Sequence, residues 1–226
     1  MNILFAAATP FEIQPLLSHL KKKFVPSGHF TFQKGETEVS VLITGAGLPM
    51  MAYSMGKILA GKEVHLAINA GIGGAFTRKF NIGDVVQVVS ERFGDLGVQE
   101  ADGRFTDVCE LGLIEADEPP FRNGQLVNEA AGQFSFLPAA HGLSVNKVHG
   151  HPPDIEAIRA KYPDAEIESM EGAAFFYACR SEGIPFLEIR SVSNYVEARN
   201  RENWDIPLAI EKLNEVLVEL VGSFFG

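Results

Sequence analysis

The chain has 226 residues, of which 46% are hydrophobic, and a formal net charge of −10 at pH 7. A chain of this length and composition can bury a large core, so we expect one α/β domain over residues 1–226. Acidic residues outnumber basic ones, and the only basic block is Lys21-Lys22-Lys23. This charge balance excludes an electrostatic surface for nucleic acid.

The apolar stretches of the chain are too short for a membrane protein. None approaches the roughly 20 residues that cross a bilayer, so we expect no membrane partner. The N-terminal MNILFAAA has no basic segment before it and runs into Thr9 and Glu12, which predicts a strand rather than a secretion signal. Cys109 and Cys179 have no metal-ligand spacing and are too few to staple the fold, which favours a cytoplasmic location.

Short apolar runs alternate with helical patterns along the chain. Strands are predicted at residues 3–8, 39–44, 65–70, 85–90, 143–148, 165–168 and 184–189. Helices are predicted at residues 10–23, 48–60, 154–161, 170–182 and 205–224. Such alternation is typical of βαβ units and of a sheet with parallel strands. The acidic, glycine-bearing stretch at residues 93–120 is assigned to no element.

Polar residues at the ends of two predicted elements can bear chemistry. Thr9-Pro10-Phe11-Glu12 has the pattern of a helix capping box, yet Glu12 also lies just past a strand, where a carboxylate can take a proton from water. Glu171, after Ser169 and Met170, opens a later helix. The helix dipole alone favours an acid there, but a carboxylate in a crevice can also accept hydrogen bonds from two ribose hydroxyls.

Glycines follow two of the predicted strands. Thr44-Gly45-Ala46-Gly47 and Ala70-Gly71-Ile72-Gly73-Gly74 allow close approach of the backbone to a ligand. Neither run matches a phosphate-binding loop or a dinucleotide fingerprint. His141, His149 and His151 have no acidic partners at metal-binding spacing, so we predict no metal site.

Taken together, these residues resemble the nucleoside phosphorylase and nucleosidase superfamily over nearly the whole chain. The features are Glu12 after the first strand, the turns at Gly45 and Gly71, Ser169-Met170-Glu171, and Arg190-Ser191-Val192-Ser193-Asn194. Within the superfamily, residues 192–201 with Trp204 resemble the futalosine hydrolases most. The resemblance implies a three-layer α/β/α fold around a mixed, mostly parallel sheet, no cofactor, and a homodimer or larger homo-oligomer.

The resemblance also implies hydrolysis of the bond between a purine and its ribose. By position, Glu12 would deprotonate the attacking water with help from Arg190, Glu171 would hold the ribose hydroxyls, and Met170 would line the sugar pocket. Further substrate contacts are expected from Ser193, Gly71 and Val148, the last within a candidate base-stacking wall at residues 145–149. This chain departs from adenine-releasing relatives at Ile72, where they have a serine that would bind the water.

Asn194 bears on the choice of base. Relatives that release adenine have an aspartate at the matching place, whereas an amide carries a fixed donor and a fixed acceptor. Its NH₂ can donate to a carbonyl at purine position 6 while its oxygen accepts the N7 proton, which predicts a 6-oxopurine and therefore futalosine. The alternative is that Asn194 only ends the strand with a local turn.

Three other functions remain open at this point. A phosphorylase needs cations at a glycine loop, and residues 44–48 carry none, although Arg78 is a candidate from elsewhere in the chain. An adenine-releasing methylthioadenosine/adenosylhomocysteine nucleosidase is disfavoured chiefly by Asn194. A nucleoside-binding protein without turnover is opposed only by the presence of Glu12, Glu171 and Arg190.

Overall fold

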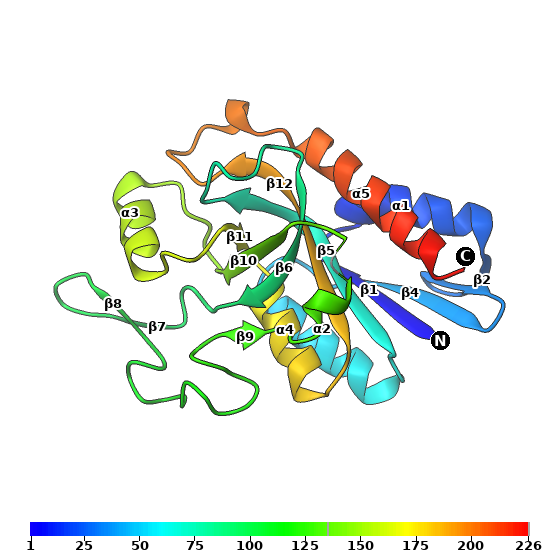
Figure 1. Ribbon diagram of the computed structural model, residues 1–226, viewed down its shortest axis with the longest axis horizontal. Helices are drawn as coiled ribbons and strands as arrows, with labels where there is room; N and C mark the ends of the chain where they lie inside the picture. Colours follow the sequence, from blue (N-terminus) through cyan, green and yellow to red (C-terminus); the bar gives the residue numbers. More distant parts are fainter. Residues whose placement is uncertain (135, 226) are drawn as a thin grey trace.

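The computed structural model describes residues 1–134 and 136–225, and its centre is a ten-stranded mixed sheet (Figure 1). The strand order is β11-β10-β6-β12-β5-β1-β4-β3-β2, and a short β9 adds to β6. The strands are β1 (Asn2–Ala7), β2 (Val25–Gly28), β3 (Thr31–Lys34), β4 (Thr37–Ile43), β5 (Leu66–Ala75), β6 (Val85–Glu91), β9 (Leu126–Val127), β10 (Ala139–Ser144), β11 (Ile167–Ser169) and β12 (Phe186–Tyr195). The mixed sheet that the sequence predicted is therefore confirmed.

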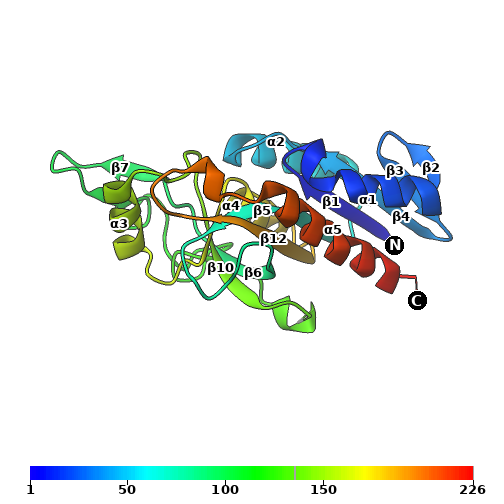
Figure 2. The same cartoon turned by 90° about the horizontal axis from the view of Figure 1, so that it is seen from above.

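Helices cover both faces of the sheet, because side chains alternate along each strand. On β1, Ile3 and Phe5 pack in the core beneath α1 (Pro10–Lys23) and α5 (Ile206–Ser223), which lie side by side (Figure 2). Leu4 and Ala6 pack in a second core with α2 (Leu48–Gly61) and α4 (Gly172–Ser181). This arrangement confirms the three-layer α/β/α prediction.

One part of the sheet closes on itself. β5 pairs in parallel with β1 and β12, and its last residues pair antiparallel with β11. β6 then joins β12 to β10, and β10 joins β11, which completes the ring. α4 packs against β5, β6, β10 and β12 of this ring, so polar residues of several segments can meet at its first residue, Gly172.

Several predicted boundaries are wrong. The predicted strand 143–148 is β10, which ends at Ser144, because its first half is small or polar and carries little apolar signal. The predicted strand 184–189 continues to Tyr195, since Arg190 and Ser191 are buried in the sheet rather than placed in a loop. Glu171 precedes α4 as its N-cap and is not inside the helix. The short strands β2 and β3 were not predicted.

The unassigned stretch at residues 93–120 has a defined structure. It contains the hairpin of β7 (Gly97–Gln99) and β8 (Phe105–Asp107), followed by a series of turns. In Figure 1 the hairpin lies with α3 (Pro152–Lys161) at one end of the molecule. Short 3-10 helices occur at Ala131–Phe134 and Arg201–Asn203. Among the described residues, no helix has the length and apolarity that a membrane crossing requires.

Candidate active site

Glu12 belongs both to the helix cap and to the polar cluster. One carboxylate oxygen, Oε2, accepts from the backbone N–H and the hydroxyl of Thr9, each at 3.0 Å, and this closes the predicted capping box. The other oxygen, Oε1, accepts from the backbone N–H of Ile72 at 3.3 Å. The two oxygens are thus divided between the cap and the cluster, and the two interpretations of Glu12 are compatible.

Arg190 crosses Gly71 to approach Glu12. A Cβ built on Gly71 would lie 2.1 Å from a terminal nitrogen of Arg190 and 3.0 Å from Oε1 of Glu12. Only glycine therefore leaves room for the guanidinium beside this carboxylate. Gly71 therefore contributes to the site by leaving space for the guanidinium of Arg190.

Glu171 lies on the opposite side of the same guanidinium. Its Oε2 is 3.7 Å from a terminal nitrogen of Arg190, and its Oε1 accepts from the backbone N–H of Gly47 at 2.9 Å. Gly47 has a φ of +103° and precedes α2, so this glycine presents its N–H where most residues are disfavoured. The structure brings together three residues that the sequence singled out, Glu12, Glu171 and Arg190.

Asn194 lies beside Gly74 near the end of β12. The strand has a register shift between Val192 and Asn194, and Asn194 pairs with Gly74. Its Nδ2 donates to the carbonyl of Tyr195 at 3.0 Å, and its Oδ1 accepts from the hydroxyl of Ser193 at 2.8 Å. Because a backbone carbonyl can only accept, these contacts fix which side of the amide is the donor.

Two other predicted residues lie at the surface of this region. Met170 is half-buried directly before Glu171, and Val148 is 37% exposed on the loop after β10. In the same loop His149 is held by Glu168, whose oxygens contact the ring Nδ1 at 2.5 Å and the backbone N–H at 3.0 Å. Among the described residues, no hydrogen bond or ion pair joins Val148 to the cluster, and its role as part of a stacking wall stays a prediction.

Burial and neighbouring charges shift the acidity of the cluster. Burial raises the pKa of the Glu12 carboxyl; Arg190 opposes that rise, and the carboxylate of Glu171 adds to it. The pKa of Arg190 lies above its ordinary value because the nearby carboxylates outweigh burial, so its guanidinium stays cationic. A carboxyl with a raised pKa beside a fixed cation has the properties of a general base.

Sequence reasoning missed two buried carboxyl groups behind the cluster. Glu188 lies two residues before Arg190 on β12, and its Oε1 accepts from Nε of Arg190 at 2.8 Å. Glu91 ends β6 and accepts from the hydroxyl of Ser144 at 2.9 Å. The alternation of β12 was the available signal, because residues two apart on a strand lie on the same face.

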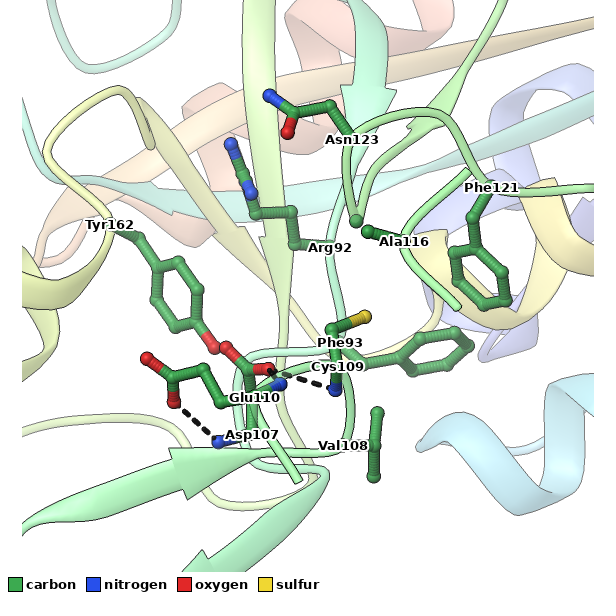
Figure 3. Close-up of a pocket in the computed structure, with 11 residues that line it drawn as sticks. Arg92, Phe93, Asp107, Val108, Cys109, Glu110, Ala116, Phe121, Asn123 and Tyr162 are labelled. Atoms are coloured by element: carbon green, nitrogen blue, oxygen red, sulfur yellow. Dashed lines mark hydrogen bonds between the residues drawn. The ribbon is translucent and has the colours of Figure 1, made fainter. Parts of the chain in front are cut away.

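A separate cavity lies between residues 92–124 and Tyr162, the residue that follows α3 (Figure 3). Arg92, Cys109, Phe121 and Tyr162 are among its lining residues. The loop beneath it is held by Asp107, whose carboxylate accepts from the backbone N–H of Cys109 at 3.0 Å. None of the predicted site residues lines this cavity.

Comparison with known proteins gives the family and the fold of the chain. The model of the phosphorylase superfamily matches residues 2–222. The chain is 33% identical to the futalosine hydrolase of Acidothermus cellulolyticus over 187 residues, covering 80% of this chain and 74% of that protein. It is 28% identical to the 5'-methylthioadenosine/S-adenosylhomocysteine nucleosidase of Bacillus subtilis over 212 residues, covering 91% of this chain and 90% of that protein.

Among solved structures, the native futalosine hydrolase of Helicobacter pylori superposes with a TM-score of 0.78 at 16% identity. The match covers 99% of this chain and 98% of that one, and at this identity it supports the fold alone. The superfamily that the sequence resembles is confirmed by the family model and by the relative at 33% identity. The chain belongs to the phosphorylase superfamily and is a nucleosidase within it.

Proposed function

We propose that this nucleosidase hydrolyses the N-glycosidic bond of futalosine and releases hypoxanthine, a step of the alternative menaquinone pathway. The observation that carries the proposal is the amide of Asn194 beside Gly74, three residues along β5 from Gly71, where Arg190 approaches Glu12. The 33% identity to a futalosine hydrolase supports the same assignment.

In the proposed reaction, water attacks the anomeric carbon of the ribose as the bond to the purine breaks. Positive charge grows on the sugar, and negative charge grows on the leaving base. Glu12 accepts the proton of the water through Oε1, which faces the cluster, while Oε2 stays in the helix cap. Arg190 orients this carboxylate and the water, and Glu171 accepts hydrogen bonds from the ribose hydroxyls, with Met170 against the sugar.

The hydrogen-bonding positions of the Asn194 amide that have no partner support a 6-oxopurine. Each amide has two N–H donors and two acceptor positions on its oxygen. Tyr195 takes one donor and Ser193 takes one acceptor position, so one of each is left. We infer that the free donor binds the carbonyl at purine position 6, and that the free acceptor accepts a hydrogen bond from N7–H of the leaving base, whose proton comes from a solvent water molecule. This places transition-state stabilisation on the leaving base.

A substrate panel tests this function. Purified protein is incubated separately with futalosine, methylthioadenosine and inosine, with and without phosphate, and free bases are separated by chromatography. We expect hypoxanthine from futalosine at a rate that phosphate does not change. Phosphate-dependent release would indicate a phosphorylase, and binding without release of a base would indicate a binding protein.

A second candidate is the release of adenine from methylthioadenosine or adenosylhomocysteine. The 28% identity to the Bacillus subtilis nucleosidase, over 91% of this chain, favours it. In the same panel, this candidate predicts adenine from methylthioadenosine at a kcat/KM above that for futalosine.

We also propose that the chain acts as a homodimer or larger homo-oligomer and that residues 1–226 form one domain. Large apolar side chains are exposed near the start of α2 and on α4, with Met50 at 49%, Tyr53 at 71% and Tyr177 at 45%. A face of this kind is typical of contacts between subunits. Sedimentation of the wild type and of a Tyr53→Glu variant tests the assembly.

For the compartment we propose the cytoplasm, because both cysteines are free thiols.

A further inference from the structure

Behind the catalytic cluster, Arg190 is held at its inner nitrogen. Its side chain is almost fully buried, and Nε donates to Oε1 of Glu188 at 2.8 Å. Glu188 itself is completely buried. The guanidinium is planar, so fixing Nε also fixes the directions of the two terminal nitrogens.

Those terminal nitrogens face the two carboxylates of the proposed reaction. One lies over Gly71, beside Oε1 of Glu12, and the other is 3.7 Å from Glu171. The latter nitrogen has no hydrogen-bond partner among the described residues. The direction in which this nitrogen points therefore depends on the contact at Nε and on packing.

We propose that Glu188 is a positioning residue for hydrolysis. It holds Arg190 at Nε so that the terminal nitrogens of Arg190 point toward Glu12 and Glu171. The role rests on the nucleosidase function proposed above. It requires a buried anion, since an uncharged acceptor holds the guanidinium more weakly against the attraction of Glu171 and Glu12. It also predicts that Glu188 affects the reaction only through Arg190.

A second buried carboxyl group, Glu91, provides the matched comparison. A Cβ built on Gly172 would lie 2.1 Å from Oε1 of Glu91 and 2.6 Å from Oε1 of Glu188, so the two carboxyl groups are neighbours. Burial and the charge of Glu188 hold the pKa of Glu91 well above its ordinary value, which favours the protonated form of this carboxyl group. Glu91 makes no hydrogen bond to Arg190. It shares the burial of Glu188 without its contact to the arginine.

The experiment compares Glu188→Gln, Glu188→Asp and Glu91→Gln in the full chain, with the nucleoside that the wild type cleaves. We expect Glu188→Gln to lower kcat by about tenfold to a hundredfold, because a small misplacement of a catalytic group has effects of this size. KM should change by less than about threefold, since Glu188 does not touch substrate. Glu188→Asp should recover part of kcat, and Glu91→Gln should stay within about twofold of the wild type.

A double-mutant cycle separates positioning from a structural role. In an Arg190→Lys background, the side chain has no guanidinium Nε–H that Glu188 could hold. Glu188→Gln should therefore lower kcat no further in this background. Additive losses in the cycle would overturn the proposal, and so would an equal loss of kcat in Glu91→Gln.

A spectroscopic readout decides the question without turnover. The Nε–H of Arg190 should give a slowly exchanging NMR signal in the wild type and in Glu91→Gln. The signal should move and exchange faster in Glu188→Gln. An unchanged signal would refute the role of Glu188, whether or not futalosine is cleaved. If no nucleoside is cleaved, the proposed function fails, and this measurement still tests the contact at Nε.

Discussion

At the scale of single residues, Glu12 shows how one side chain serves a helix end and a site. Its Oε2 completes the capping box with Thr9, while Oε1 lies in the cluster with Ile72 and Arg190. The cap holds the carboxylate in one orientation, which reduces the ordering that the reaction would otherwise require. The two roles can be separated by chemistry, because glutamine also serves in a capping box.

Glu12→Gln should therefore abolish activity while preserving stability. We expect kcat to fall by about 10²–10⁴, the usual contribution of a general base. The free energy of unfolding should change by less than about 1 kcal/mol, since the cap survives. Denaturant unfolding and steady-state kinetics on the same preparation check both parts. Thr9→Ala is the opposite control, and it should lose about 1 kcal/mol of stability.

Asn194→Asp should change the preference for the base. The carboxylate has no N–H to donate to a carbonyl at purine position 6, and it would face the carbonyl of Tyr195. We expect kcat/KM for the 6-oxopurine substrate to fall by about tenfold or more relative to a 6-amino analogue, which corresponds to at least ~1.4 kcal/mol. Competition between the two nucleosides measures the ratio directly. A ratio equal to that of the wild type would show that the amide does not contact the base.

At the scale of elements, the start of α4 depends on a glycine. Gly172 is the first residue of the helix, and the carboxyl groups of Glu91 and Glu188 occupy the space that a side chain would need. Serines of β10 and β11 accept hydrogen bonds from the backbone N–H groups of the first turn, which have no partner within the helix. Ala173 N–H donates to Ser144 Oγ at 2.8 Å. The helix start, the buried acids and the arginine thus form one packed unit.

Gly172→Ala should destabilise the protein although alanine is the better helix former. The added Cβ would lie 2.1 Å from a carboxyl oxygen, and overpacking of this kind costs about 1–3 kcal/mol. Gly56→Ala in α2 is the control, because nothing lies within 4 Å of its Cβ position. That variant should gain about 0.5–1 kcal/mol from helix propensity. Chemical denaturation of both variants measures the contrast, and equal effects would contradict the crowding at Gly172.

The contrast between predicted and observed elements has a physical cause. Periodic apolar runs such as residues 205–224 predicted α5 to within one residue at each end, because one continuous stripe packs on the sheet. The end of β12 was missed because buried polar residues follow its apolar run, and β10 was misplaced because its first half is small or polar. The buried polar residues of β12 belong to the site. Glu12, Glu171 and Arg190 were recognisable by family resemblance, whereas Glu91 and Glu188 acquire meaning only from pairings between distant strands.

At the scale of the whole molecule, buried carboxyl groups make stability depend on pH. The pKa of Glu91 is raised well above its ordinary value, first by burial and then by Glu188. Between the ordinary value and the raised one, the folded state therefore binds more protons than the unfolded state. The stabilising contribution of the protonated group is complete at low pH and is lost as the pH rises through the raised pKa.

Glu91→Gln should flatten this dependence. The amide stays neutral at every pH, so the Tm of the variant relative to the wild type should increase as the pH is raised from about 5 to about 9. A gain of 1 kcal/mol corresponds to roughly 2–4 °C for a chain of this size. Differential scanning calorimetry across the pH series measures the difference. Parallel curves for the two proteins would show that Glu91 does not titrate in this range.

Among the described residues, the ring formed by β5, β12, β6, β10 and β11 leaves the main sheet with two strands whose outer sides are unpaired, β2 and the two-residue β9. Unpaired backbone groups on such a strand can form hydrogen bonds with a strand of another chain, which extends the sheet. β2 has only four residues, and Pro26 lacks the amide hydrogen that an incoming strand would use. β2 is thus a poor template for end-to-end fibre growth at this margin of the main sheet.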